Sequence, residues 1–164
     1  MKNIFLKNKN QTSRGFTLVE IIVACAIMSL VSITLMTSAT KGIELSDRAL
    51  KQSQASMLLE EGVEATKSIR DNNWSEISSL SGNNYLSFNT SLWSLSSSNP
   101  VEIIDGIFTR TVQVSDVYRD NNDDISSTGT LDDDTKRINV IVEWPIHGGT
   151  SSKNITFYVT NIFN

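Results

Sequence analysis

Residues 14–36 read RGFTLVEIIVACAIMSLVSITLM, and this stretch decides the fold. Its apolar part, residues 16–36, would span about 30 Å as a helix rising ~1.5 Å per residue, which matches the hydrocarbon core of a bilayer. Glu20 is the one charged residue in that part. An ionised carboxylate costs roughly 3 kcal/mol inside a membrane helix. We therefore expect Glu20 to have a cationic partner, rather than to be protonated or to extend to the membrane interface.

The charge of the chain changes next to this stretch. Residues 1–15 carry Lys2, Lys7, Lys9 and Arg14 without any acidic residue, whereas the whole chain has a net charge of −4. Basic residues mark the cytoplasmic side of membrane helices. We therefore expect a single-pass protein of the cytoplasmic membrane, with its N-terminus in the cytoplasm and the bulk of the chain on the other side.

The composition excludes several classes of protein. A single Cys cannot form an intrachain disulfide, and one Cys with one His cannot form a zinc site of these residues. The net charge of −4 argues against nucleic-acid binding by bulk charge. No glycine-rich phosphate loop or catalytic set of side chains occurs, so we expect no enzymatic activity. Cys25 is interpreted as a small packing residue, and His147 as a surface residue in a turn.

The string from Arg14 to Glu20 resembles the class III signal of type IV pilins and pseudopilins, which joins a basic leader, Gly-Phe, a Glu five residues after the Gly, and an apolar run. The resemblance implies that residues 1–15 are a prepilin leader, which a prepilin peptidase removes by cutting after Gly15. Phe16 would become the new N-terminus and be methylated on its amine. Glu20 would pair with the N-terminal ammonium of a neighbouring subunit, and such a buried pair favours registered docking of helices.

The helical pattern continues beyond the apolar run. No proline occurs over residues 37–71, and apolar or small side chains recur there at amphipathic-helix spacing. We predict one helix from about residue 16 to 71, with a transmembrane segment over 16–36 and an amphipathic continuation that packs on a globular head. Gly42 is a place where the helix could melt locally. The inward positions are Ala55, Leu58, Leu59, Gly62, Val63, Thr66 and Ile69.

The end of this predicted helix narrows the resemblance. Residues 60–74 read EEGVEATKSIRDNNW and are similar to the run that closes the long helix in PilV-type minor pilins. Within it, Asp71, Asn72 and Asn73 are turn-forming residues that stop a helix. The resemblance therefore implies a minor pilin.

Two segments of the remaining chain are predicted to be loops. Residues 72–100 are rich in Ser and Asn and are expected to form an irregular connection, with Tyr85, Phe88 and Trp93 packed inward. Residues 119–134 are expected to form an acidic loop.

Residues 101–164 are predicted to form an antiparallel β-sheet, because apolar and polar residues alternate there with period two. Asp105 and Gly106 predict a tight hairpin turn, and Pro145 is expected to end a strand. The fold class is therefore α+β, a long N-terminal helix packed on a small C-terminal antiparallel sheet, which is the pilin fold. The predicted inward residues are Ile138, Val140, Val142, Trp144, Ile155, Phe157 and Val159.

The acidic loop contains calcium candidates, Asp120, Asn122 and Asp124. Their spacing departs from a calcium-binding EF-hand, because Ile125 stands where Gly is needed and no Glu closes the loop. A solvated loop is the favoured interpretation, and we expect no cofactor.

Three functions remain open. The resemblance implies a minor type IV pilin-like structural subunit, which is processed by prepilin peptidase and assembled with other pilin subunits from the bilayer into an extracellular or periplasmic filament. A membrane platform protein and its ATPase would be indirect partners. The first alternative is a minor pseudopilin of a type II secretion or DNA-uptake machine, which has the same N-terminus. The second is a secreted binding module whose ordinary signal peptide is cut after Ala39.

Overall fold

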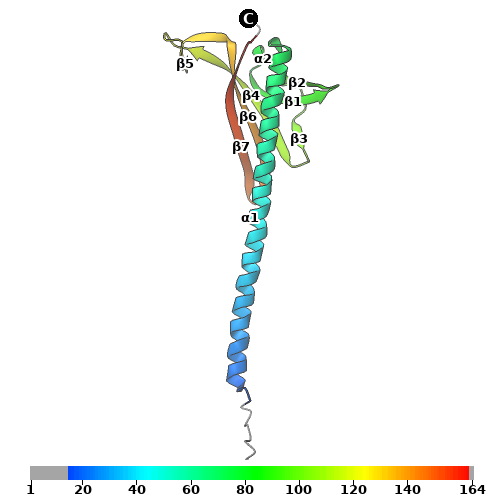
Figure 1. The fold of residues 1–164 in the computed structure, drawn as a ribbon, viewed down its shortest axis with the longest axis vertical. Coiled ribbons are helices and arrows are strands. Elements are labelled where there is room, and N and C mark those ends of the chain that lie inside the picture. Colours follow the sequence, from blue (N-terminus) through cyan, green and yellow to red (C-terminus); the bar gives the residue numbers. More distant parts are fainter. Residues whose placement is uncertain (1–14, 163–164) are drawn as a thin grey trace, which may run out of the picture. The chain divides into compact units, whose positions relative to one another are not determined.

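The computed structural model describes residues 15–162 (Figure 1). The chain divides into two compact units, Met1–Asp47 and Arg48–Asn164. The predicted leader lies outside the described residues except for Gly15. The elements in chain order are α1 (Leu18–Asn72), α2 (Ser75–Ser78), β1 (Gly82–Asn89), β2 (Leu92–Ser96), β3 (Glu102–Ile104), β4 (Phe108–Arg119), β5 (Ile125–Ser126), β6 (Thr130–Ile146) and β7 (Gly149–Thr160).

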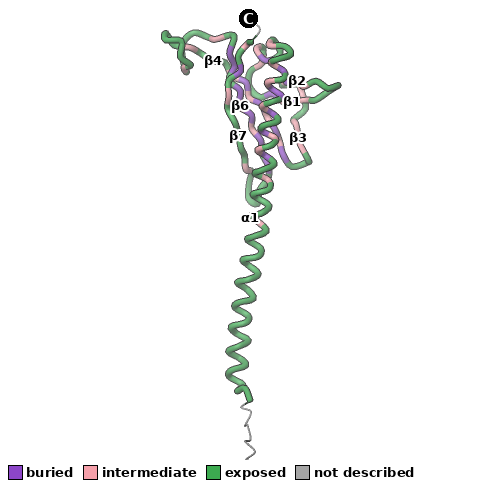
Figure 2. The backbone as a smooth tube through the Cα atoms, in the orientation of Figure 1, coloured by how far each residue is buried: buried purple, intermediate pink, exposed green. Residues whose placement is uncertain are grey.

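The described part of the first unit is the beginning of α1 with three residues before it. No side chain between Leu18 and Asp47 is buried, although this part holds the apolar run (Figure 2). The helix passes through Gly42 without a break, so the predicted local melting is not observed. Among the described residues, α1 is the one helix long and apolar enough to cross a membrane.

In the second unit, the rest of α1 buries one stripe of side chains, as the spacing predicted. The stripe packs on the sheet and includes Ala65 in addition to the predicted positions, while Leu58 and Val63 are half-buried. Gly62 lies at the closest approach, since a Cβ built there would be 2.8 Å from Cγ1 of Val140. Glycine is a weak helix former, but at this position it allows the helix to pack closely on the sheet. The buried residues of the stripe are Ala55, Leu59, Gly62, Ala65, Thr66 and Ile69.

The sheet of the second unit is antiparallel and has the strand order β2-β1-β4-β6-β7, with β3 and β5 also paired to β4. Alternate residues of β4 and β6 face the core, which confirms the predicted alternation from Ile138 to Trp144. Burial of each such side chain stabilises the fold by about 1.5–3 kcal/mol. The predicted α+β fold class is confirmed. The buried residues of β4 and β6 that form the core are Phe108, Val112, Val114, Ile138, Val140, Val142 and Trp144.

The predicted hairpin turn is confirmed between β3 and β4. Asp105 and Gly106 have φ values of 52° and 66°, as a type I′ turn requires. The strands pair from Ile104 opposite Phe108.

The prediction of an irregular loop over residues 72–100 is wrong, because this segment forms α2 and the β1–β2 hairpin. The many Ser and Asn residues obscure the alternation of apolar and polar side chains in these strands. Across the hairpin, Leu86 pairs with Leu95 and Phe88 with Trp93. The hairpin turn also lacks glycine, since Thr90 and Ser91 themselves adopt positive φ. The aromatic residues do not all pack inward, and Phe88 is 59% exposed at the end of the hairpin.

The predicted acidic loop is also wrong in part. β4 runs to Arg119, β6 already begins at Thr130, and β5 adds a short pairing, so most of the segment is an extended hairpin. A register shift between Asp116 and Val117 interrupts the alternation that would have predicted these strand ends.

Two smaller predictions about β6 and β7 need correction. Pro145 does not end β6 but lies within it, opposite Thr150, beyond the last pair that β6 makes with β4. Ile155 is 41% exposed, whereas Val159 is buried and Phe157 is half-buried. Because β7 is an edge strand, its inward side chains lack a neighbouring strand on one side.

Candidate functional site

Thr17 caps the N-terminus of α1. The backbone N–H of Glu20 donates to Oγ1 of Thr17 at 3.3 Å, and the N–H groups of Glu20 and Ile21 donate to the carbonyl oxygen of Thr17 at 3.1 and 3.2 Å. Threonine followed three residues later by glutamate is the spacing of a capping box. The start of the helix is therefore fixed by a side chain that the sequence prediction did not single out.

The predicted processing residues lie just before the helix. Gly15, Phe16 and Thr17 are not helical, and the Phe16 side chain is 79% exposed. A Cβ built on Gly15 would meet no atom within 4 Å. The Gly15–Phe16 peptide bond is therefore outside α1 and free of steric cover among the described residues.

Glu20 lies on one face of the helix, which forms a shallow apolar groove. The groove residues follow one another at the i, i+4 spacing of a single helix face. The small side chains among its lining residues, Ala24, Cys25 and Ser29, would let the backbone of another helix come close. Residues three and four positions after Glu20 are uncharged, so its own helix offers no cation at this spacing. The groove is lined by Phe16, Glu20, Ile21, Ala24, Cys25, Met28 and Ser29.

The hydroxyl groups of this apolar segment are satisfied within the helix. Four hydroxyl groups in and just after the apolar run donate to the carbonyl oxygen of the residue four positions earlier, at 2.6–2.9 Å. Apolar surroundings tolerate such hydroxyls because no donor is left without an acceptor. These four donors are Ser29, Ser32, Thr37 and Thr40, and Thr34 donates to the carbonyl oxygens of Leu30 and Val31 at 3.2 and 2.8 Å.

The calcium candidates lie in the turn of the acidic hairpin. Oδ1 of Asp120 accepts the backbone N–H groups of Asn122 and Asp124 at 2.8 and 3.1 Å, so this carboxylate shapes the turn. Across residues 15–162, no group of three or more Asp, Glu, His or Cys side chains is arranged to hold a metal ion. The preference for a solvated turn without a cofactor remains a prediction.

An ion pair holds the strands of this hairpin together. Nε of Arg119 donates to Oδ2 of Asp132 at 2.6 Å, and the Asp134 N–H donates to Oδ1 at 3.0 Å. Partial burial alone would raise the pKa of Asp132, but these hydrogen bonds outweigh it and place the pKa below its ordinary value.

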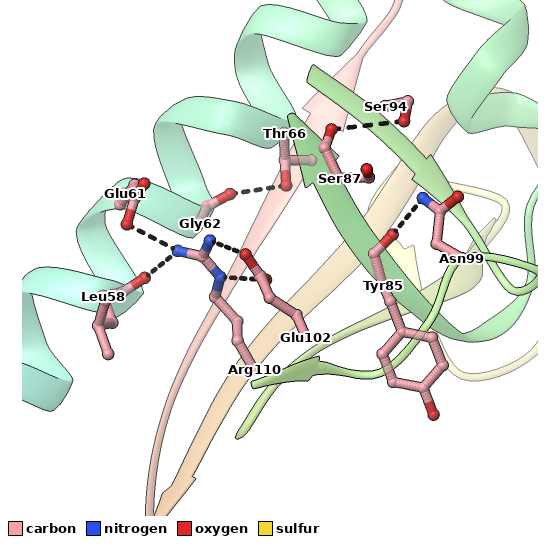
Figure 3. A network of polar contacts seen from close by, with 10 residues as sticks. All are labelled: Leu58, Glu61, Gly62, Thr66, Tyr85, Ser87, Ser94, Asn99, Glu102 and Arg110. Carbon is pink, nitrogen blue, oxygen red and sulfur yellow. Dashed lines mark hydrogen bonds and ion pairs between the residues drawn. The ribbon is translucent and has the colours of Figure 1, made fainter. Parts of the chain in front are cut away.

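The head also contains a buried charge that the sequence prediction missed (Figure 3). Arg110 is 1% exposed, and its guanidinium binds both carboxylate oxygens of Glu102 at 2.6 and 2.8 Å. It also donates to the carbonyl oxygen of Leu58 at 2.9 Å and to the Glu61 carboxylate at 3.1 Å, both on α1. The ring of Trp93 lies over it, with 5.8 Å between ring centre and Cζ. Arg110 thereby joins β3, β4 and α1.

The environment of Arg110 stabilises its charge. Burial alone would lower the pKa of Arg110, but the hydrogen bonds and negative charges of Glu102 and Glu61 outweigh burial, and the pKa is raised from its ordinary value. The signal was present in the sequence, since Arg110 occupies an inward position between Phe108 and Val112. An inward charge requires a partner, and the hairpin register places Glu102 directly opposite.

The remaining predicted site residues stay apart from these features. His147 is exposed in the β6–β7 turn, and Cys25 is exposed on the groove face of α1. The structure thus brings Gly15, Phe16 and Glu20 together at one end of a helix and leaves the calcium candidates in a separate unit.

The comparisons with known proteins agree with the N-terminal geometry. Residues 10–36 match the family model described as the prokaryotic N-terminal methylation motif. No significant match was found among curated proteins or among solved structures. The matched segment contains Gly15, Phe16 and Glu20, and it leads into an exposed apolar helix of a chain with a pilin-like α+β arrangement. The motif and this arrangement together support a type IV pilin-like or pseudopilin-like precursor with a class III signal.

Proposed function

We propose that this chain is a minor type IV pilin-like structural subunit. A prepilin peptidase would cleave it after Gly15, and α1 would carry it from the membrane into a pilus. The observation that carries the proposal is the position of Glu20, a lone carboxylate in the first turn of an exposed apolar helix whose first part belongs to the methylation motif.

The apolar segment of α1 needs a covering that residues 15–162 do not provide. Its large hydrophobic side chains are 50–76% exposed, a state that costs free energy in water. A bilayer covers them before assembly, and the apolar helices of other subunits cover them afterwards. These side chains are Leu18, Val19, Ile21, Ile22, Val23, Ile27, Met28, Leu30, Val31, Ile33, Leu35 and Met36.

Cleavage would create a cationic partner for Glu20. Hydrolysis of the Gly15–Phe16 bond releases an amine on Phe16, and methylation keeps this amine cationic. Glu20 of one subunit and Phe16 of the next attract each other strongly in apolar surroundings, while either charge alone is costly there. The pair would reward one register of neighbouring helices, and the groove around Glu20 offers small side chains for their close approach.

The proposal of a minor pilin rests on residues 60–74, through their similarity to the helix end of such proteins. The head would select its partners, and it is not proposed to be an enzyme. The N-terminus would lie in the cytoplasm and the head outside it, in agreement with the basic residues before the apolar run. A pseudopilin would use the same N-terminal chemistry, and genes for a secretion channel or a retraction motor next to this one would separate the two machines.

N-terminal sequencing of the membrane-bound protein tests the processing step. We expect Phe16, with a methylated amine, in cells that contain prepilin peptidase, and the uncut precursor in cells that lack it. Gly15→Val should retain the leader, because the bulkier side chain hinders cleavage at this bond. A mature protein that begins at Thr40 and is freely soluble would instead identify an ordinary secreted module.

Glu20→Gln tests the assembly step. We expect the variant to insert in the membrane and to be cleaved, but to be lost from purified filaments by tenfold or more, since the neutral amide cannot pair with the ammonium group. Glu44→Gln is the matched control, because Glu44 is a helix carboxylate outside the apolar run, and it binds Lys41 at 2.8 Å. Equal incorporation of both variants would refute the proposed role of Glu20.

A further inference from the structure

We infer that Thr17 is a positioning residue for removal of the leader, because its cap keeps the Gly15–Phe16 bond outside helix α1. The inference rests on the proposed cleavage after Gly15 and adds a residue to it. Thr17 would not touch the reacting atoms. It would determine the backbone conformation in which the peptidase binds the Gly15–Phe16 bond.

The first step concerns where the helix starts. Leu18 is the first helical residue, and Thr17 accepts backbone N–H groups of the first turn with both its side-chain and its carbonyl oxygen. An N-cap residue has non-helical backbone angles, so it marks where the helix stops in the N-terminal direction. The helix consequently begins at Leu18, and Thr17 separates it from Phe16.

The second step concerns what happens without the cap. In apolar surroundings a backbone N–H without an acceptor costs several kcal/mol on transfer scales, so a helix end near the membrane either keeps a cap or recruits more backbone. If Thr17 lost its hydroxyl and became a good helix former, the helix would extend toward Phe16. The Gly15–Phe16 bond would then be drawn into helical backbone.

The third step concerns the substrate requirement of peptide hydrolysis. Cleavage needs an exposed peptide bond that can enter the cleft of an enzyme, and helical segments must open locally before they are cut. Gly15 and Phe16 meet this requirement in the structure, since both are exposed and neither is helical. The cap therefore makes the bond available without local unfolding.

The test measures the single-turnover rate of leader removal from the full precursor in detergent micelles by purified prepilin peptidase. Thr17→Ala removes the capping oxygen and should slow cleavage about fivefold, the fold-change that corresponds to the ~1 kcal/mol typical of an N-cap. Thr17→Ser and Thr17→Asn keep an oxygen that can cap and should cleave at the wild-type rate. Thr37→Ala is the matched control, because the Thr37 hydroxyl bonds to the carbonyl oxygen of Ile33 inside the same helix and caps nothing.

The variants separate the cap from recognition of the threonine side chain by the enzyme. Asparagine differs from threonine in shape but caps as well, so rescue by both Thr17→Ser and Thr17→Asn would support the inference. Slow cleavage of Thr17→Asn beside normal cleavage of Thr17→Ser would overturn it in favour of direct recognition. Wild-type cleavage of Thr17→Ala would overturn it as well. The Cα chemical shifts of residues 16 and 17 give a second readout, and we expect them to move toward helical values in Thr17→Ala.

The failure of this inference differs from the failure of the proposed function. If the wild-type precursor is not cut after Gly15, the proposed function fails. If the wild type is cut there and Thr17→Ala is cut equally fast, only the role of Thr17 fails.

Discussion

Helix α1 satisfies opposite requirements in the two units of this protein. Up to Asp47 it buries no side chain and exposes a long apolar surface, whereas from Arg48 onward it buries a narrow stripe against its own sheet. The second part packs on residues of the same chain, while no residue among 15–162 covers the first part, for which we propose lipid and then other subunits as the covering. Substitutions in the second part should therefore change folding, and substitutions in the first part should change processing or assembly.

The largest expected effect on folding comes from the ion pairs of Arg110. Glu102→Ala removes the carboxylate that binds its guanidinium in two places and leaves a buried cation with incomplete compensation. Loss of one partner of a buried pair costs about 3 kcal/mol or more, so we expect a large decrease in the denaturant midpoint of the full-length protein in micelles, followed by tryptophan fluorescence.

The control for this variant is Glu64→Ala, which removes an exposed helix pair with Lys67. We expect that change to cost about 0.5 kcal/mol or less. Leader cleavage should stay normal in both variants. Slower leader cleavage in Glu102→Ala would contradict the assignment of folding to the second part of α1 and of processing to the first part.

A pair of glycine substitutions in the same helix compares the two units directly. Gly62→Ala places a methyl group 2.8 Å from Val140, and we expect a net destabilisation of about 1 kcal/mol, because overpacking outweighs the gain in helix propensity. Gly42→Ala meets no atom within 4 Å and should stabilise its part of the helix by about 1 kcal/mol. Denaturant unfolding of the head checks the first, and amide exchange near residue 42 checks the second. If both substitutions changed stability in the same direction, the contrast between the two units would be wrong.

The smallest expected effect is a pH dependence confined to the acidic hairpin. The pKa of Asp132 is lowered in the folded protein, so its contribution is fully present above about pH 4, near the ordinary pKa of an aspartate. The contribution is lost as the pH falls through the lowered pKa, when the carboxylate is protonated and its bond with Arg119 weakens. Carboxyl-carbon NMR of Asp132 checks the direction, and Asp132→Asn should remove the dependence while leaving leader cleavage unchanged.

The features that the sequence predicted are those with a strong local signal. The motif around Gly15 and Glu20 is one, and the alternation from Ile138 to Trp144 is another. The Asp105-Gly106 turn was predictable because its residues tolerate positive φ. In each case a few neighbouring residues determine the local structure, so no knowledge of distant contacts was needed.

The features that the sequence did not predict depend on contacts across the fold. The β1–β2 hairpin has a turn of Thr90 and Ser91, which show no turn signal, and tertiary pairing overrides their preference. The partners Leu58 and Glu61 of Arg110 lie about fifty positions away, so only the packing of helix on sheet brings them together. The cap at Thr17, in contrast, is local, and its spacing to Glu20 was enough to predict it.

The back-bonded hydroxyls in the apolar segment have a consequence for how such a subunit could leave a bilayer. Ser29, Ser32, Thr37 and Thr40 carry their acceptors with them, so a change from lipid to protein neighbours breaks none of these bonds. In the proposed assembly, extraction exchanges one apolar environment for another, and the charges whose surroundings change are those of Glu20 and of the amine on Phe16. A helix segment of this kind can move between lipid and protein surroundings repeatedly without breaking these internal hydrogen bonds.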